Sequence, residues 1–292
     1  MEGMGHMGGA TTIEWRNGMV TSRDGTDIAF LSDGRGPGLM VIPGNNRRAH
    51  HYGSLARRLS STYTVHVIER RGRGHSGPQG PAYSMEAEVD DALAVMRHTG
   101  SDLVFGHSYG GLVALHLGLR RQVTALMAYE PGVSIDGSFD ARWLPSFTRL
   151  LEEGKHVAAM TTFLKHTRLA PIGDAPTAVF RGLAFLLLQG AEGRDARAMM
   201  PTTPAEIGEI VRLDSDGSRY AAVTSPTLLI GGQKSPTYLT GVLPHLARTM
   251  PDARDVILPG LDHNAPDLNA PDVVAEQIRT FIQAQLDGRQ RR

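Results

Sequence analysis

One short segment limits what this chain can fold into more than any other. An apolar run enters a glycine-rich turn that reads Gly-His-Ser-Tyr-Gly over 106–110, and a helical apolar pattern follows at once. This strand–turn–helix setting is the one that a nucleophile elbow of the form G-x-S-x-G needs. Gly106 and Gly110 leave room where a side chain would collide with the turn. Ser108 is therefore the predicted nucleophile, held with its hydroxyl clear of the backbone.

Apolar runs typical of buried strands alternate with helical patterns along most of the chain. Strands that alternate with helices form mostly parallel sheets with helices on both faces. The pattern therefore predicts an α/β fold around a mostly parallel, eight-stranded sheet. The predicted strands cover 18–22, 26–32, 39–42, 64–69, 103–106, 124–129, 227–230 and 253–258, and the helices between and after them cover 52–59, 84–98, 112–120, 242–248 and 272–286.

One long segment, 131–222, contains helical patterns and no good strand. Glycine and proline breaks divide it into four predicted helices. A helical insertion between two core strands is typical of a cap or lid, which would exclude water and shape a substrate pocket. We therefore expect an N-terminal extension over 1–17, a core over 18–130 and 223–292, and a cap over 131–222. The four predicted cap helices cover 142–153, 155–166, 176–189 and 204–213.

Composition excludes several kinds of function. The chain has 292 residues, 41% of them hydrophobic, which suits one large domain or a core with an insertion. Its 30 basic and 30 acidic residues balance, so charge gives no reason to expect nucleic acid or an anionic membrane as partner. Cysteine is absent, which excludes disulfides and a cysteine nucleophile. No signal peptide or spanning stretch is apparent, so we expect a cytoplasmic protein; its oligomeric state stays open.

The elbow, the alternation of strands and helices and the helical insertion together resemble the α/β-hydrolase superfamily, over about 18–286. In that fold the catalytic residues follow the order nucleophile, acid, histidine. The resemblance implies that His263 is the general base, because it follows the last predicted strand and precedes the C-terminal helix. It would take the proton of Ser108 and return it to the leaving group. His107, inside the elbow, is expected only to pack beside the sheet.

The acid departs from the common pattern of this superfamily. Many members carry aspartate in a Gly-x-x-Asp turn after the strand that follows the cap, where this chain has Lys234 and Ser235. A known variant places the acid at the end of the strand before the cap, which makes Glu130 the candidate. Glu130 would accept the Nδ1–H of His263 and fix its tautomer. The alternatives are adjacent Asp262, with poor geometry, and the more remote Asp214 and Asp216.

Two backbone N–H groups are expected to form an oxyanion hole. Tyr109, at the start of the helix after Ser108, supplies the first, helped by the positive end of the helix. The loop Pro-Gly-Asn-Asn over 43–46 supplies the second, for which we expect the N–H of Asn45. Side-chain amides of Asn45 or Asn46 are an alternative. The next residues, His50, His51 and Tyr52, either face the pocket or lie on a helix surface.

A second glycine-rich segment, 72–77, matches G-x-G-x-x-G after a strand and by itself suggests dinucleotide binding. Phosphate binding of that kind needs a helix to begin at the glycines, and here Pro78 and Pro81 delay the helix to about Ser84. The segment instead resembles a turn common in α/β-hydrolases. No cluster shows metal-ligand spacing, so we expect neither a cofactor nor a metal.

The expected activity is a serine hydrolase that cleaves a carboxylic ester, thioester or lactone of an apolar small molecule through an acyl-enzyme on Ser108. One alternative is an acyltransferase, lyase or cyclase that uses the same serine and histidine. Another is a ligand-binding, receptor-like protein with weak turnover. Cap aromatics either contact the substrate or fill the core of the cap. These aromatics are Trp143, Phe147, Phe163, Phe180 and Phe185.

Overall fold

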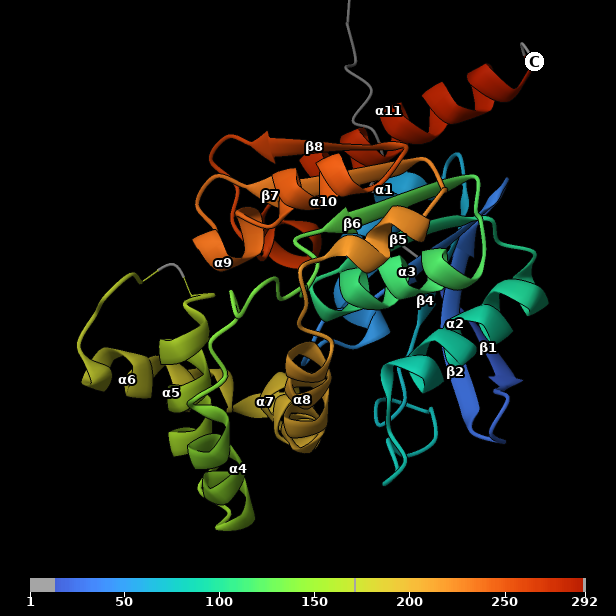
Figure 1. The fold of residues 1–292 in the computed structure, drawn as a ribbon. Coiled ribbons are helices and arrows are strands. Elements are labelled where there is room, and N and C mark those ends of the chain that lie inside the picture. Colours follow the sequence, from blue (N-terminus) through green and yellow to red (C-terminus); the bar gives the residue numbers. More distant parts are fainter. Residues whose placement is uncertain (1–13, 171, 291–292) are drawn as a thin grey trace, which may run out of the picture.

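A mixed eight-stranded sheet forms the centre of the computed structural model, which describes residues 14–170 and 172–290 (Figure 1). The strand order is β1-β2-β4-β3-β5-β6-β7-β8; β2 pairs antiparallel with β1 and with β4, and all other pairs are parallel. The strands are β1 (Arg16–Thr21), β2 (Asp27–Gly34), β3 (Gly38–Ile42), β4 (Thr64–Ile68), β5 (Leu103–His107), β6 (Ala125–Tyr129), β7 (Thr227–Gly232) and β8 (Ala253–Leu258). This confirms the predicted α/β class.

Helices cover both faces of the sheet, so that each face has its own apolar core. The core on one face joins α1 and α11 to the sheet, and the core on the other face joins α2, α3 and α10 to it (Figure 1). Because both faces are covered, every residue of β5, β6 and β7 is buried, which explains their continuous apolar sequences. These helices are α1 (Gly53–Leu59), α2 (Met85–Thr99), α3 (Tyr109–Arg120), α10 (Leu243–Thr249) and α11 (Pro271–Gln290).

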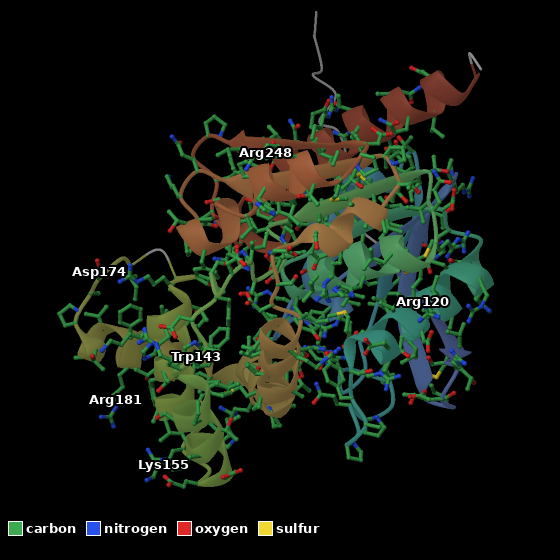
Figure 2. All side chains as sticks on the ribbon, in the orientation of Figure 1. Arg120, Trp143, Lys155, Asp174, Arg181 and Arg248 are labelled. Carbon is green, nitrogen blue, oxygen red and sulfur yellow. The ribbon has the colours of Figure 1, made fainter. Side chains whose placement is uncertain are left out.

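The predicted helical insertion lies between β6 and β7. Within the described residues its only strand-like contact is a single bridge between Ile135 and Ser215. Figure 2 shows Trp143 among the helices of this insertion. The ring of Trp143 contacts Phe147 and Phe163 edge-on at centroid distances of 5.6 and 5.8 Å. Its helices are α4 (Leu144–Glu152), α5 (His156–Thr167), α6 (Thr177–Leu187), α7 (Gly190–Met199) and α8 (Thr203–Arg212).

Several predicted boundaries were wrong. The first strand begins at Arg16, inside the expected extension of 1–17, whose residues 1–13 lie outside the described part of the chain. The last helix continues to Gln290 rather than ending at 286. Two helices were missed: α7, whose glycines and charged residues give little apolar periodicity, and the four-residue α9 (Thr237–Thr240). Among the described residues, no helix is long and apolar enough to cross a membrane.

Candidate active site

Ser108 occupies a strained turn between β5 and α3. Its φ of 56° and ψ of −121° lie where residues with a side chain are rare, and its side chain is partly exposed. The flanking glycines permit this turn. A Cβ on Gly106 would lie 2.2 Å from the carbonyl oxygen of Gly110, and one on Gly110 would lie 2.1 Å from that of Ile42. Crowding of this kind is the physical basis of the Gly-x-Ser-x-Gly spacing.

The structure brings His263 and Glu130 into contact. Nδ1 of His263 lies 2.6 Å from Oε2 of Glu130, which is fully buried at the end of β6. The other carboxylate oxygen accepts the N–H of Gly232 at 2.7 Å, so both oxygens have partners. Because an ionised carboxylate only accepts hydrogen bonds, Nδ1 of His263 carries the proton and Nε2 is left to accept one.

The three alternative acids have other partners. Asp214 accepts the N–H of Gly137 with both oxygens, at 2.9 and 3.1 Å. Asp216 accepts the N–H of Ser218, and Asp262 accepts that of Asn264. Glu130 is thus the one predicted candidate that the structure places against the ring of His263.

The loop after β3 lies directly against the elbow. A Cβ on Gly44 would lie 3.1 Å from Cβ and 3.7 Å from Oγ of Ser108. The N–H of Gly44 donates to the hydroxyl of Tyr52 at 3.0 Å, so it is already used. The next N–H of the loop belongs to Asn45, and the first N–H groups of α3, including that of Tyr109, have no partner within the helix.

The side-chain amides of this loop point to other groups. Nδ2 of Asn45 donates to Oε2 of Glu206 in α8 at 2.8 Å, and Nδ2 of Asn46 donates to Oδ1 of Asn45 at 2.7 Å. These contacts favour backbone rather than side-chain donors in an oxyanion hole. They also attach the loop to the helical insertion.

His107, which sequence reasoning treated as packing, joins three parts of the site. Its Nε2 lies 2.8 Å from the carbonyl oxygen of His263 and therefore donates to it. Its Nδ1 then accepts the hydroxyl proton of Tyr52 at 2.7 Å, and Tyr52 in turn accepts the N–H of Gly44. Burial lowers the pKa of His107, and so do the charge of Arg47 and the charge that His263 carries when it is protonated, in keeping with a neutral ring. The chain of bonds links elbow, oxyanion loop and His263 loop.

Ser108, His263, Asn45 and Tyr109 line one narrow cavity of about 40 Å³. Of the predicted cap aromatics only Phe163 lines it, and Phe139, which the sequence gave no reason to select, joins it. Trp143, Phe147 and Phe180 are buried and Phe185 is 54% exposed. The other lining residues are Gly132, Thr167, Leu169, Ile207, Ile210, Tyr238 and Leu239.

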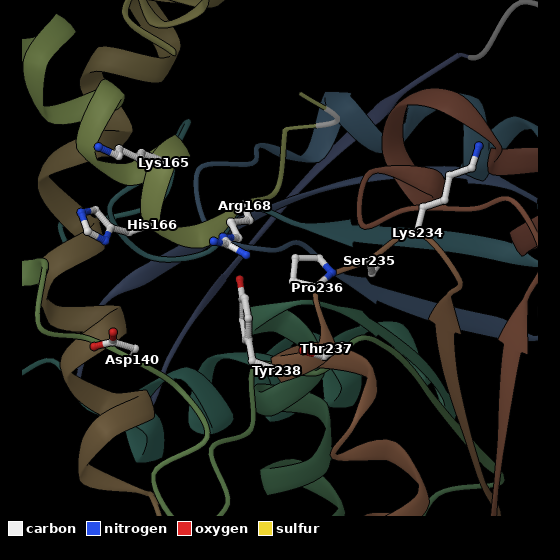
Figure 3. A pocket seen from close by; sticks show the side chains of 9 residues that line it. All are labelled: Asp140, Lys165, His166, Arg168, Lys234, Ser235, Pro236, Thr237 and Tyr238. Atoms are coloured by element: carbon white, nitrogen blue, oxygen red, sulfur yellow. The ribbon is translucent and has the colours of Figure 1, made fainter. Parts of the chain in front are cut away.

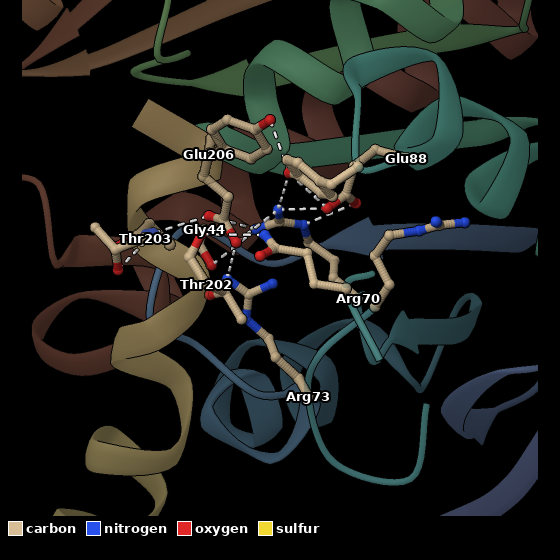
Figure 4. Close-up of polar contacts among 12 residues, drawn as sticks. Gly44, Arg70, Arg73, Glu88, Thr202, Thr203 and Glu206 are labelled. Atoms are coloured by element: carbon tan, nitrogen blue, oxygen red, sulfur yellow. Dashed lines mark hydrogen bonds and ion pairs between the residues drawn. The ribbon is translucent and has the colours of Figure 1, made fainter. Parts of the chain in front are cut away.

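A buried cluster of charges connects the core to α8 (Figure 4). Arg70 pairs with Glu88 at 2.6 Å and with Glu206 at 3.1 Å, and Arg73 also pairs with Glu206. The guanidinium of Arg70 lies 4.5 Å above the ring of Tyr109. Burial by itself would raise the pKa of Glu206, but the charges of Arg70 and Arg73 outweigh it and lower that pKa. Sequence reasoning missed this cluster.

His50 and His51 face Glu192 of α7, and Tyr52 is buried. Ligand atoms of His50, His51 and Glu192 lie within 4.8 Å of one another, close enough to suggest a metal site. However, Nδ1 of His51 accepts the N–H of Arg48 at 2.9 Å, so its Nε2 carries the proton and donates to Glu192 at 3.0 Å. The hydrogen bond between His51 and Glu192 accounts for their proximity without an ion, and we assign no metal here.

Comparisons with known proteins agree with this architecture. The model of the alpha/beta hydrolase family matches residues 39–277. The chain is 26% identical over 262 residues to 2-(acetamidomethylene)succinate hydrolase of Mesorhizobium japonicum, covering 86% of this chain and 90% of that protein. It is 27% identical over 141 residues to pimeloyl-[acyl-carrier protein] methyl ester esterase of Vibrio vulnificus, covering 45% of this chain and about half, 53%, of that relative.

A solved structure of an alpha/beta hydrolase from Sphaerobacter thermophilus superposes with a TM-score of 0.76 at 29% identity. The match covers 90% of this chain and 99% of that one. The family model spans well over half of the sequence, and the strand order, elbow and helical insertion fit it. The chain belongs to the alpha/beta hydrolase family.

Proposed function

We propose that this hydrolase cleaves a carboxylic ester, thioester or lactone with Ser108 as nucleophile, His263 as general base and Glu130 as the acid that orients His263. The observation that carries the proposal is the 2.6 Å contact between Glu130 and Nδ1 of His263, at a cavity that Ser108 also lines. The names of the relatives, a hydrolase and a methyl ester esterase, support the same reaction class.

In the first half of the proposed reaction, Oγ of Ser108 attacks the carbonyl carbon and Nε2 of His263 takes its proton. The oxyanion is stabilised by the N–H groups of Asn45 and Tyr109. Collapse of the tetrahedral intermediate breaks the bond to the leaving group, which receives the proton from His263. Glu130 stabilises the transient imidazolium. Water then attacks the acyl-enzyme as Nε2 of His263 takes its proton. Collapse of this second tetrahedral intermediate breaks the bond between the acyl carbon and Oγ of Ser108, releases the acid, and lets His263 return the proton to Oγ.

The segment 131–222 is proposed to act as a lid. The cavity of about 40 Å³ is far smaller than the ~300–1,000 Å³ typical of ligand pockets, so substrate entry requires the inserted helices to move. Closure would exclude water and bring apolar side chains, including Phe139 and Phe163, against the acyl group.

The test is hydrolysis of p-nitrophenyl acetate, butyrate and hexanoate by the wild type, Ser108→Ala, Glu130→Gln and Ser235→Asp. Glu276→Gln is the matched control, because Glu276 is exposed in α11 and, within residues 14–170 and 172–290, pairs only with neighbouring groups of its helix. We expect turnover in the wild type and control and its loss in folded Ser108→Ala and Glu130→Gln. Full turnover by Glu130→Gln would remove Glu130 from the triad.

The solvent oxygen distinguishes hydrolysis from its alternatives. Reaction in ¹⁸O-labelled water should place one labelled oxygen in the released acid. Acyl products without label would favour acyl transfer or another non-hydrolytic reaction. Binding of an ester with no turnover in the wild type, unaffected by Ser108→Ala, would favour a receptor-like protein.

A further inference from the structure

A larger pocket of about 710 Å³ lies beside the Ser108 cavity, between α5 and the loop that follows β7 (Figure 3). Lys165 and Arg168 contribute from the end of α5, and Lys234, Ser235 and Tyr238 contribute from the opposite loop and α9. Figure 3 shows Arg168 between these two walls, above Tyr238. The pocket is therefore formed jointly by the insertion and the core.

This pocket continues to the proposed catalytic residues. A connecting pocket of about 220 Å³ shares Arg168, Lys234 and Ser235 with it and is also lined by His263. Tyr238 lines both the large pocket and the Ser108 cavity. A molecule whose reacting group lies at Ser108 can thus reach Arg168 and Lys234 along the side of His263.

Positively charged side chains are concentrated at this pocket. The sequence contains only three lysines, Lys155, Lys165 and Lys234, and two of them line this pocket together with Arg168. Two carboxylates lie on the walls, and both already have donors. Asp140 accepts from Arg142 at 2.7 Å, and Asp262 accepts from the N–H of Asn264 at 2.8 Å.

Two further features indicate a polar ligand. Oγ of Ser235 is buried and has no hydrogen-bond partner among the residues described here, although it borders both basic pockets. Arg168 pairs with Asp174 at 2.9 Å, but the side chains of the two are 64% and 83% exposed. Exposed pairs of this kind contribute little, so an anion can replace Asp174 at small cost.

We propose that the basic pocket binds a carboxylate of the substrate, remote from the scissile carbonyl, at Arg168, with Ser235 as a neutral donor and with Lys165 and Lys234 adding positive charge from the two walls. The inference rests on the proposed function, and it names the substrate class as an ester or thioester that also carries a free carboxylate. Arginine and lysine at this position select the charged end, while the Ser108 cavity accepts the apolar part.

The test uses pairs of substrates that differ only in charge. One pair is the p-nitrophenyl monoester of adipic acid and the same ester of adipic monoamide, which places the charge on the acyl side. The second pair is 4-carboxyphenyl acetate and 4-carbamoylphenyl acetate, which places it on the leaving group. The ratio of kcat/KM, acid over amide, is measured for the wild type, Arg168→Gln, Arg168→Lys, Lys165→Gln and Lys234→Gln. Lys155→Gln is the control, since Lys155 lies outside these pockets and pairs with Glu153.

We expect the wild type to prefer the acid in at least one pair, and Arg168→Gln to lower that acid-over-amide ratio about tenfold. Arg168→Lys should retain part of the preference, Lys155→Gln all of it, and added salt should reduce it. Equal rates for acid and amide in both pairs, or a preference that Arg168→Gln, Lys165→Gln and Lys234→Gln all leave intact, would overturn the inference. In that case, hydrolysis of the amide-bearing esters by the wild type, and its loss in Ser108→Ala, would still support the proposed function. If the wild type hydrolysed none of the four esters, the proposed function itself would be overturned.

Discussion

Glu206 provides the sharpest test of how the helical insertion is held to the core. Its side chain is fully buried and accepts from Arg70, Arg73 and Asn45. In Glu206→Gln, Arg70 keeps its pair with Glu88 at 2.6 Å. Arg73 loses its negatively charged partner. Apart from residue 206, its guanidinium has only a 3.4 Å contact with the hydroxyl of Thr202, and its Nε and Nη1 have no partner within the described structure. The substitution therefore leaves a buried guanidinium without a compensating charge.

Removing one partner of a buried ion pair costs about 3–5 kcal/mol, and we expect the free energy of unfolding to fall by that amount. A change of this size lowers the Tm by about 6 °C or more. The exposed pair formed by Glu276 and Arg279 gives the control, and Glu276→Gln should change stability by less than about 1 kcal/mol.

The loss of stability in Glu206→Gln should depend on pH, and the direction of that dependence follows from the pKa of Glu206. The arginine charges outweigh burial and lower the pKa of Glu206 in the folded protein. Its stabilisation is therefore fully present above the pKa of an unfolded glutamate, about 4.3, and is lost as the pH falls through the lower folded pKa. Thermal unfolding of the wild type and Glu206→Gln at pH 7 and at acid pH measures the loss of stability and its dependence on pH. A Glu206→Gln protein that unfolds like the wild type at pH 7 would refute the reasoning.

Three further predictions concern the site. Glu130→Gln should lower kcat about 10³–10⁴-fold in steady-state assays, because an amide can donate to Nδ1 of His263 and so favour the wrong tautomer; a loss below tenfold would contradict this role. Tyr52→Phe leaves the N–H of Gly44 and Nδ1 of His107 unpaired, so unfolding free energy measured in urea should fall by about 1–3 kcal/mol, and kcat should fall as well. If the unfolding free energy and kcat of Tyr52→Phe both equalled those of the wild type, the hydrogen bonds of Tyr52 would not link Gly44 and His107 in the way described. Gly106→Ala places a Cβ 2.2 Å from a backbone oxygen, so a Tm equal to that of the wild type would contradict the described turn.

Sequence reasoning predicted the sheet well because the relevant signals are local. Each core strand is a short apolar run, and the crowding of Gly106 and Gly110 is inherent in the spacing of the elbow. Glu130 was selected because a known variant of the α/β-hydrolases carries the acid at the end of the strand before the cap, and the structure puts Glu130 against His263. Its catalytic role stays a prediction, as do those of Ser108 and His263.

The parts that were missed depend on contacts between distant segments. Glu206 follows Arg70 by 136 residues and Arg73 by 133, and no local pattern indicates that they meet. His107 could be placed beside the sheet, but its bonds to Tyr52 and His263 require three segments that are distant in the sequence to converge. Helix α7 lacks the apolar periodicity that reveals an amphipathic helix, since its packing involves few apolar positions.

The central claim is that Ser108 forms a covalent acyl-enzyme, and a single measurement tests it most directly. The wild type is mixed with p-nitrophenyl butyrate, quenched in acid within the first turnovers, and digested for mass spectrometry, with Ser108→Ala treated in parallel. The account predicts one butyryl group in the wild type, on the peptide that contains Ser108. In Ser108→Ala it predicts neither the butyryl group nor turnover. Turnover by Ser108→Ala at the wild-type rate, or acylation of another residue at the rate of catalysis, would contradict it.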